Sequence, residues 1–97
     1  MFMKIHRSRD TSDVIAICDR ELINTTISSG TMTVTISEWF YGKSPAQEEE
    51  IREALRSAGN INLMGERTIS FAMEMGIITR DDCIMIGKIP HVQVYCL

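Results

Sequence analysis

Apolar and polar positions alternate strictly in two segments of the chain. In residues 1–8, Met3 and Ile5 alternate with polar neighbours, which predicts a half-buried strand. In residues 31–37, methionine, valine and isoleucine alternate with hydroxyl residues. This second pattern predicts a strand whose threonine side faces water, since β-branched threonine favours strands.

Other segments are apolar without alternation. Residues 14–18 form such a run, which is typical of a strand covered on both faces. The polar segment 8–13 precedes it, so the first two strands are expected to form a hairpin. The remaining short elements are predicted strands at 83–86 and 92–96, loops at 24–30 and 87–90, and turns at 19–23 and 79–82, the first of these turns with Asp19 as its N-cap.

The clearest start signal for a helix lies in the middle of the chain. Ser44 fits an N-cap, Pro45 fits the first helical position, and Gln47 follows three residues after the cap. Residues 48–50 are all glutamate, and the helix dipole favours negative charge in a first turn. The buried stripe is predicted to contain Ile51, Leu55 and Ala58, with Gly59 as the break.

A second helix is predicted over residues 60–75, because its apolar residues recur at helical spacing. Gly76 stands where a left-handed C-terminal residue belongs. Gly65 lies inside this predicted helix, where glycine costs about 1 kcal/mol relative to alanine. A glycine at such a position indicates the close approach of another part of the backbone.

These elements predict one small α+β domain spanning residues 1–97. The expected order is β-β-β-α-α-β-β, with a mostly antiparallel sheet of about five strands packed against two helices. An apolar fraction of 44% and a charged fraction of 24% are ordinary for a globular domain.

Charge and hydropathy narrow the function classes. A net charge of -3 argues against a strongly basic nucleic-acid-binding protein, but it leaves room for a local basic patch. No apolar run approaches the roughly 20 residues that cross a bilayer, and the N-terminus is too short and polar for a signal peptide. We therefore expect a cytoplasmic domain with no membrane partner.

Three cysteines form an odd set without a C-x-x-C pair. Cys18, Cys83 and Cys96 each lie in an apolar run, so all three are expected to be reduced core thiols. Their spacing does not match a zinc site. We expect neither a bound metal nor a cofactor.

Several blocks of the sequence resemble a known family. The blocks are Lys4-Ile5-His6-Arg7, Ala16-Ile17-Cys18-Asp19, Phe40-Tyr41-Gly42, Asn62-Leu63-Met64-Gly65-Glu66-Arg67 and Ile89-Pro90-His91-Val92-Gln93-Val94. Together they resemble, over nearly the whole chain, an archaeal family described as domain of unknown function four-two-four. The resemblance implies a cytoplasmic protein and an association with translation factors, and it implies no catalytic residues.

Polar residues of the predicted second helix form one candidate binding surface. Asn62 and Glu66 are four residues apart, so they would share a helix face, and Asn60 and Arg67 would lie nearly in register. Together with Gly65 they could hold a ligand or a partner. Two other interpretations stay open: an exposed helix face, or a buried Asn62 at a helix junction.

The two histidines and the nearby basic residues form another candidate. Arg7 and Arg9 follow the first strand, and Lys88 precedes His91. If the first and last strands were neighbours, these residues could form a phosphate-binding patch. Alternatively, the arginines are simply solvated, and nearby aspartates cancel much of their electrostatic field. The candidate surface includes His6, Arg7, Arg9, Asn62, Gly65, Glu66, Arg67, His91 and Gln93.

Three adjacent aromatic residues, Trp39, Phe40 and Tyr41, allow two interpretations. They could stack nucleobases. They also precede a helix start, where apolar residues often attach the chain to the core. We favour core packing, because a small core can hardly spare half of its aromatic residues.

Three functional hypotheses follow. The first is a non-enzymatic binding domain that contacts RNA or protein in the setting of translation. The second is a small enzyme that uses His6 or His91 as a base with Glu66 as its partner. The third is a homodimer or larger oligomer formed through the final strand, if that strand lies at a sheet edge.

Overall fold

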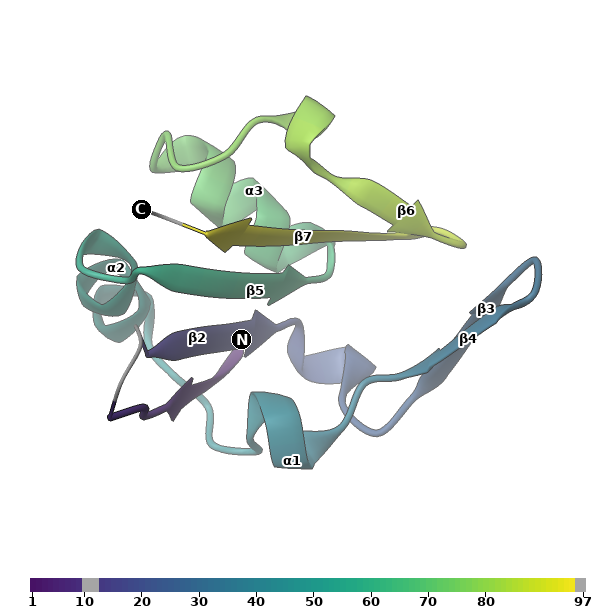
Figure 1. The fold of residues 1–97 in the computed structure, drawn as a ribbon, viewed down its shortest axis with the longest axis horizontal. Helices are drawn as coiled ribbons and strands as arrows, with labels where there is room; N and C mark the ends of the chain where they lie inside the picture. The colour runs from purple at the N-terminus through teal and green to yellow at the C-terminus, as the bar shows by residue number, and fades with distance from the viewer. Residues whose placement is uncertain (10–12, 96–97) are drawn as a thin grey trace.

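A mixed five-stranded sheet forms the centre of the molecule in the computed structural model, which describes residues 1–9 and 13–95 (Figure 1). The strands are ordered β1-β2-β5-β7-β6. Neighbouring strands are antiparallel except for β2 and β5, which are parallel. The strands are β1 (Phe2–His6), β2 (Val14–Cys18), β5 (Asn60–Met64), β6 (Ile84–Ile86) and β7 (Ile89–Tyr95).

The other elements lie around this sheet. Two further strands form a separate hairpin that projects beyond the sheet (Figure 1). The predicted α+β class and the mostly antiparallel sheet are therefore confirmed. The remaining elements are β3 (Thr26–Ser29), β4 (Met32–Thr35), α1 (Glu38–Tyr41), α2 (Glu48–Arg56), α3 (Glu66–Glu74) and two 3-10 turns, η1 (Arg20–Leu22) and η2 (Arg80–Asp82).

The two faces of the sheet are covered differently. Helices α2 and α3 cover one face, where Ile17, Ile61 and Leu63 pack against Ile51 and Ile69. The opposite face carries a second, smaller core, formed with η1, α1 and the β3–β4 hairpin. Its buried residues are Phe2, Ala16, Cys18, Ile36, Tyr41, Met64 and Ile86.

The prediction of one helix over residues 60–75 is wrong in its first third. Residues 60–64 form β5, and α3 begins only at Glu66. Ile61 and Leu63 alternate with asparagines, so the segment also has a strand pattern. Pairing with β2 on one side and β7 on the other satisfies its backbone, and this long-range pairing overrides the local helical spacing.

The start of α2 is also shifted. Its N-cap is Gln47, not Ser44, and a capping box joins Gln47 to Glu50. Pro45 instead forms a bridge to Phe2 at the start of β1. This pairing keeps the segment before Gln47 outside the helix, so the helix starts later than the local signal predicts.

The loop predicted at residues 24–30 contains a strand. Residues 26–29 form β3 and pair with β4, so the predicted strand at 31–37 belongs to a hairpin outside the main sheet. Threonine hydroxyls meet across the pair, with the Oγ1 atoms of Thr26 and Thr35 3.0 Å apart. Water is a good partner for these hydroxyls, so the alternation of threonines with apolar residues indicates a hairpin with a solvent-exposed face.

Strand β7 lies between β5 and β6, not at an edge. Both of its sides are paired within the chain, so the edge position that association through the final strand requires is not met. Cys96, which we assigned to that strand, lies outside the described residues.

Candidate functional site

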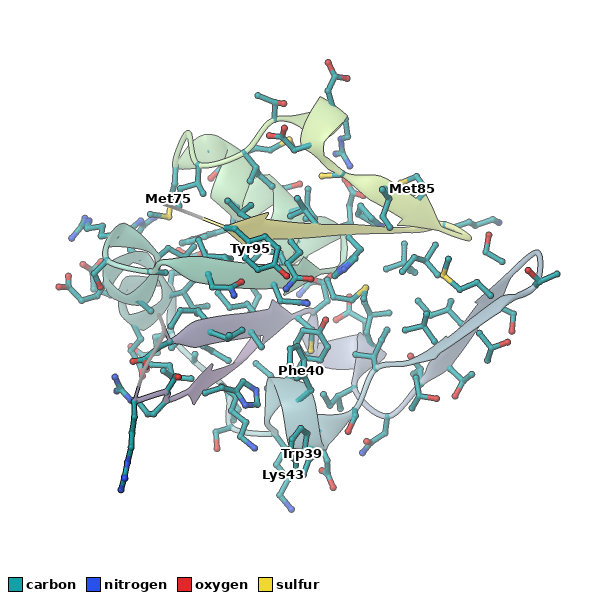
Figure 2. The ribbon with its side chains drawn as sticks, viewed as in Figure 1. Trp39, Phe40, Lys43, Met75, Met85 and Tyr95 are labelled. Atoms are coloured by element: carbon teal, nitrogen blue, oxygen red, sulfur yellow. The ribbon has the colours of Figure 1, made fainter. Side chains whose placement is uncertain are left out.

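One face of the sheet is left partly uncovered, and we call it the open face. Alternation along β1, β5 and β7 places Lys4, His6, Asn60, Asn62, Gln93 and Tyr95 on this side, opposite α2 and α3. Trp39 and Phe40 of α1 lie at its rim, and Phe40 and Tyr95 point over it in Figure 2.

Helix α1 is attached to the open face by side chains of β1. The ammonium group of Lys4 donates to the carbonyl oxygen of Trp39 at 2.6 Å. The imidazole of His6 bonds to the carbonyl oxygen of Phe40 through Nε2 at 2.7 Å. Because a carbonyl can only accept, this Nε2 carries the proton. Two long-range bonds therefore hold the single turn of α1 in place.

Trp39 is exposed, which corrects the prediction that all three aromatic residues pack in the core. It exposes 73% of its surface, whereas Tyr41 is buried and Phe40 is half-buried. Lys4 lies 5.2 Å from the centroid of the Trp39 ring, and the His6 ring lies at 5.9 Å. Helix α1 directs Tyr41 inward and leaves Trp39 in solvent, because successive residues of a helix point in different directions.

Amide side chains cross the centre of the open face. Asn62 is 8% exposed, and its Oδ1 accepts a hydrogen bond from the Tyr41 hydroxyl at 2.5 Å. Asn60 has a buried Oδ1 with no partner among the described residues. Its cross-strand neighbour Tyr95 is 67% exposed. The face thus combines exposed aromatic rings with amide groups.

The junction between β5 and α3 is built around a buried carboxylate. Asp19, only 3% exposed, accepts hydrogen bonds from the backbone N–H groups of Arg67 at 3.0 Å and Thr68 at 2.8 Å. The Thr68 hydroxyl donates to the same carboxylate at 2.8 Å. Asp19 is the N-cap residue of η1 by position, as predicted, but its side chain makes no cap bond there. Asp19 instead caps α3 across 48 residues of sequence.

Gly65 therefore stands at the N-cap of α3 and not inside a helix. Its φ of 110° lies in a region that L-residues rarely adopt. A Cβ built on Gly65 would lie 2.4 Å from Cγ of Asp19. The close approach expected at this glycine is thus real, but a side chain makes it and not another backbone.

The predicted polar helix face does not exist as such. Asn62 lies on the open face, whereas Glu66 and Arg67 begin α3 on the other side of the junction. Glu66 forms an ion pair with Arg80 at 2.6 Å, and this hydrogen bond lowers the pKa of Glu66. Asn62 is buried, as one of the two open interpretations held, but it lies in the middle of β5 and caps no junction.

The two histidines lie far apart. His6 is in β1 and His91 is in β7, three strand spacings or roughly 14 Å away across the sheet. His91 also lies at the opposite end of the strands, beside Met64, while His6 is level with Asn60. Since Glu66 is engaged by Arg80, the histidine base with a glutamate partner that the enzyme hypothesis requires is not assembled.

The basic patch is not assembled either. Arg7 forms an ion pair with Asp13 at 3.0 Å, and Arg9 lies near it in sequence at the Asn60 end of the sheet. Lys88 follows β6 near His91, at the other end. Within residues 1–9 and 13–95, no group of three or more histidine, cysteine or acidic side chains could hold a metal ion.

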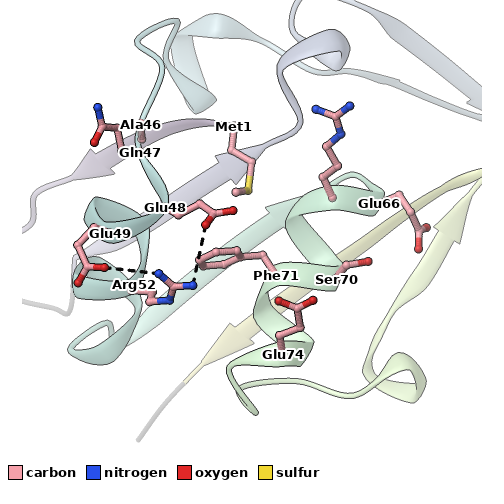
Figure 3. A pocket seen from close by; sticks show the side chains of 11 residues that line it. Met1, Ala46, Gln47, Glu48, Glu49, Arg52, Glu66, Ser70, Phe71 and Glu74 are labelled. Carbon is pink, nitrogen blue, oxygen red and sulfur yellow. Dashed lines mark hydrogen bonds and ion pairs between the residues drawn. The ribbon is translucent and has the colours of Figure 1, made fainter.

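A groove lies between α2 and α3, on the side of the sheet opposite the open face (Figure 3). It has a volume of about 860 Å³. Arg52 pairs with Glu48 and Glu49 and lies over the Phe71 ring at 5.1 Å. Carboxylates outnumber basic groups along the groove, which therefore disfavours anions; the charged lining residues are Glu48, Glu49, Glu66, Glu74, Arg52 and Arg67.

Two ionisable groups are buried in the smaller core beneath the open face. Burial, together with a smaller contribution from the Asp19 carboxylate, raises the pKa of the Cys18 thiol to about 12. Burial also raises the pKa of the Tyr41 hydroxyl. Cys18 and Cys83 are free thiols, as expected, although Cys83 is only half-buried.

Alkaline pH is expected to destabilise the domain through these groups. In the unfolded chain the thiol ionises near its ordinary pKa of 9.0, while the folded protein keeps it neutral up to about 12. The unfolded state thus binds fewer protons above pH 9, and stability falls as the pH rises through this window. Urea unfolding at about pH 8 and about pH 10.5 measures the effect. A Cys18→Ala variant should lose part of this pH dependence, and an unchanged dependence would contradict the assignment to Cys18.

Sequence reasoning named four of the six strand residues of the open face and missed Lys4 and Tyr95. Tyr95 follows His91 and Gln93 at a spacing of two, so alternation alone could have placed it beside them. Lys4 could have been found in the same way from His6. Nothing in the local sequence distinguishes the exposed Trp39 from the buried Tyr41.

None of the described helices is long and apolar enough to cross a bilayer.

The fold and the open face define a small α+β domain built on a five-stranded mixed sheet. The chain belongs to the family described as "Protein of unknown function (DUF424)", whose model matches residues 6–97. The family resemblance predicted from the sequence is therefore confirmed.

The fold is shared with a solved archaeal protein. The chain is similar to the crystal structure of an uncharacterized conserved protein from Methanopyrus kandleri, with a TM-score of 0.83 and 30% sequence identity. The match covers 99% of this chain and 90% of that chain. No match was found among curated proteins.

Proposed function

We propose that this protein is a non-enzymatic, cytoplasmic RNA-binding domain that serves translation and holds a single-stranded RNA segment on its open face. The observation that carries the proposal is the exposure of Trp39. It exposes 73% of its surface, and yet its backbone is held by Lys4 and its rim position is supported by His6.

An exposed tryptophan held in place is suited to stacking. A nucleobase that stacks on an aromatic side chain contributes about 1–3 kcal/mol, and every base offers a suitable ring face. Holding the ring in advance reduces the conformational entropy lost on binding. Tyr95 offers a second exposed ring beyond the amide groups of the open face.

The charges near α1 favour a phosphate backbone. Lys4 lies over the Trp39 ring, and Lys43 follows the C-cap of α1 in sequence. The whole chain carries a net charge of -3, so attraction to RNA must come from this local region. We therefore expect few phosphate contacts and a correspondingly shallow salt dependence.

Binding of a labelled single-stranded RNA of about twelve nucleotides tests the proposal, with fluorescence anisotropy measured across a salt series. Saturable binding that weakens with salt, and that exceeds binding to a duplex of the same sequence, is the expected result. Absence of binding even at low salt would refute RNA as the partner and would favour a protein partner.

Trp39→Ala is expected to weaken this RNA binding by about 5- to 100-fold, because it removes a stacking surface. The thermal midpoint should change little, since the side chain is mostly in solvent. Arg67→Glu is the control, because Arg67 lies at the start of α3, away from the open face. A loss with Arg67→Glu and none with Trp39→Ala would show that overall charge, and not stacking, determines binding.

A further inference from the structure

A groove between the β3–β4 hairpin and the sheet has the features of a pocket for a small planar ligand. It has a volume of about 410 Å³, within the usual range of ligand sites. We propose that this groove binds a single nucleobase of the RNA, and this inference rests on the proposed function.

Apolar side chains from two separate sheets form the walls. Met32 and Val34 of β4 face Ile84 and Ile86 of β6, and Met64 of β5 lies between them. Met32 and Ile84 are exposed although they are large and apolar. Flexible methionine side chains suit a ring that enters and leaves, because they adapt to it by rotation.

Two polar side chains lie on the floor of the groove and have unused hydrogen-bonding atoms. Asn62 is 8% exposed, and Tyr41 already occupies its Oδ1. Its amide Nδ2 has no partner among the described residues, so a donor remains for a ligand. The amide is therefore a polar group with a free donor in a groove that is otherwise lined by both apolar and hydroxyl side chains.

His91 supplies the complementary group. Its Nδ1 bonds to the carbonyl oxygen of Leu63 at 2.8 Å, and because a carbonyl only accepts, this nitrogen carries the proton. In the neutral ring, Nε2 is then an acceptor, and it has no partner in the described part of the chain. His91 and Asn62 are diagonal neighbours on adjacent strands, roughly 7–8 Å apart.

A donor beside an acceptor, between apolar walls, matches the edge and faces of a nucleobase. Each base carries N–H donors next to ring-nitrogen or carbonyl acceptors, and single-stranded RNA presents these edges to proteins. Phe40 lines the groove and also stacks on His6 at 4.8 Å, so the groove adjoins the open face. One strand could therefore stack on Trp39 and place a neighbouring base in the groove.

Titration of the intact protein with each of the four nucleoside monophosphates tests the pocket. The measured quantities are the NMR chemical shifts of the Asn62 amide and the His91 ring. At least one nucleotide is expected to shift both signals, while ribose 5-phosphate, which lacks a base, leaves them in place. Shifts from the sugar phosphate alone, or shifts confined to Trp39 and Lys4, would overturn the proposal. Larger shifts with N-acetyl-tryptophanamide would also overturn it, because they would assign the groove to a protein side chain.

A matched pair of variants separates this inference from the proposed function. His91→Asn keeps a donor near Leu63 but removes the acceptor at the position of Nε2, so nucleotide binding should weaken about five- to ten-fold. Ser57→Ala, at the exposed C-terminal end of α2 on the opposite side of the sheet, should leave it unchanged. If His91→Asn has no effect while Trp39→Ala still weakens RNA binding, the pocket is refuted and RNA binding stands.

Discussion

Replacing Gly65 by alanine is expected to destabilise the domain by more than about 3 kcal/mol. Two effects add at this position. The φ of 110° is strained for any L-residue. The new Cβ would also lie 2.4 Å from Cγ and 2.6 Å from Oδ2 of Asp19.

Neither side of this contact can move away easily. The N–H of Gly65 donates to the carbonyl of Pro90 at 2.9 Å, and the N–H of Asp19 donates to that of Met64 at 3.0 Å. These bonds attach the junction to β7 and β5. Movement of Asp19 would also break its bonds to the first turn of α3.

Urea unfolding followed by circular dichroism measures the effect. Gly76→Ala is the matched control, because Gly76 also has a positive φ, of 76°, but nothing within 4 Å of the added Cβ. It should cost only about 1 kcal/mol. Similar losses at both glycines would show that backbone strain, and not the contact with Asp19, determines the cost.

Asp19→Ala is expected to cost about 3 kcal/mol, the second large effect. It removes three hydrogen bonds to a carboxylate and leaves the N–H of Thr68 buried without a partner. It also removes a negative charge from the N-terminus of α3, where the helix dipole favours one.

Chemical denaturation of graded variants resolves these contributions. Asp19→Asn should cost less than Asp19→Ala, because one carbonyl oxygen remains for Thr68. Thr68→Val should cost about 1 kcal/mol, the value of one hydroxyl bond. A loss below about 0.5 kcal/mol for Asp19→Ala would show that water replaces the carboxylate.

The two positions should also couple. Asp19→Ala removes the Cγ and oxygen atoms that the Gly65→Ala methyl group would contact. The double variant is therefore expected to be more stable than the sum of the single losses indicates. Strict additivity would contradict the contact geometry.

The elements that could be predicted are those in which local pattern and tertiary environment agree. Residues 14–18 read as a strand covered on both faces, and β2 is buried between β1 and β5. Gly76 was assigned to the end of a helix, and its N–H closes the last turn of α3 on Met73. In both cases the local conformation that the residues prefer is also the one that packs best.

The predictions that are wrong concern segments whose secondary structure depends on contacts with residues far away in sequence. Residues 60–64 carry a pattern compatible with helix or strand, and pairing with β2 and β7 selects the strand. Pro45 has the local signal of a helix start, but its bridge to Phe2 delays the helix. The predicted binding surface is wrong for the same reason. As part of a helix, Asn62 would lie beside Glu66, whereas in the structure it belongs to β5 and Glu66 belongs to α3.

The sequence by itself determined the family, the α+β class and the alternating faces of the strands, because these follow from local periodicity and from residue blocks along the chain. Only the tertiary structure decided the strand order, the separation of His6 from His91, the burial of Asp19 under Gly65 and the exposure of Trp39. Each of these depends on contacts between residues far apart in sequence, whose pairing no local pattern records.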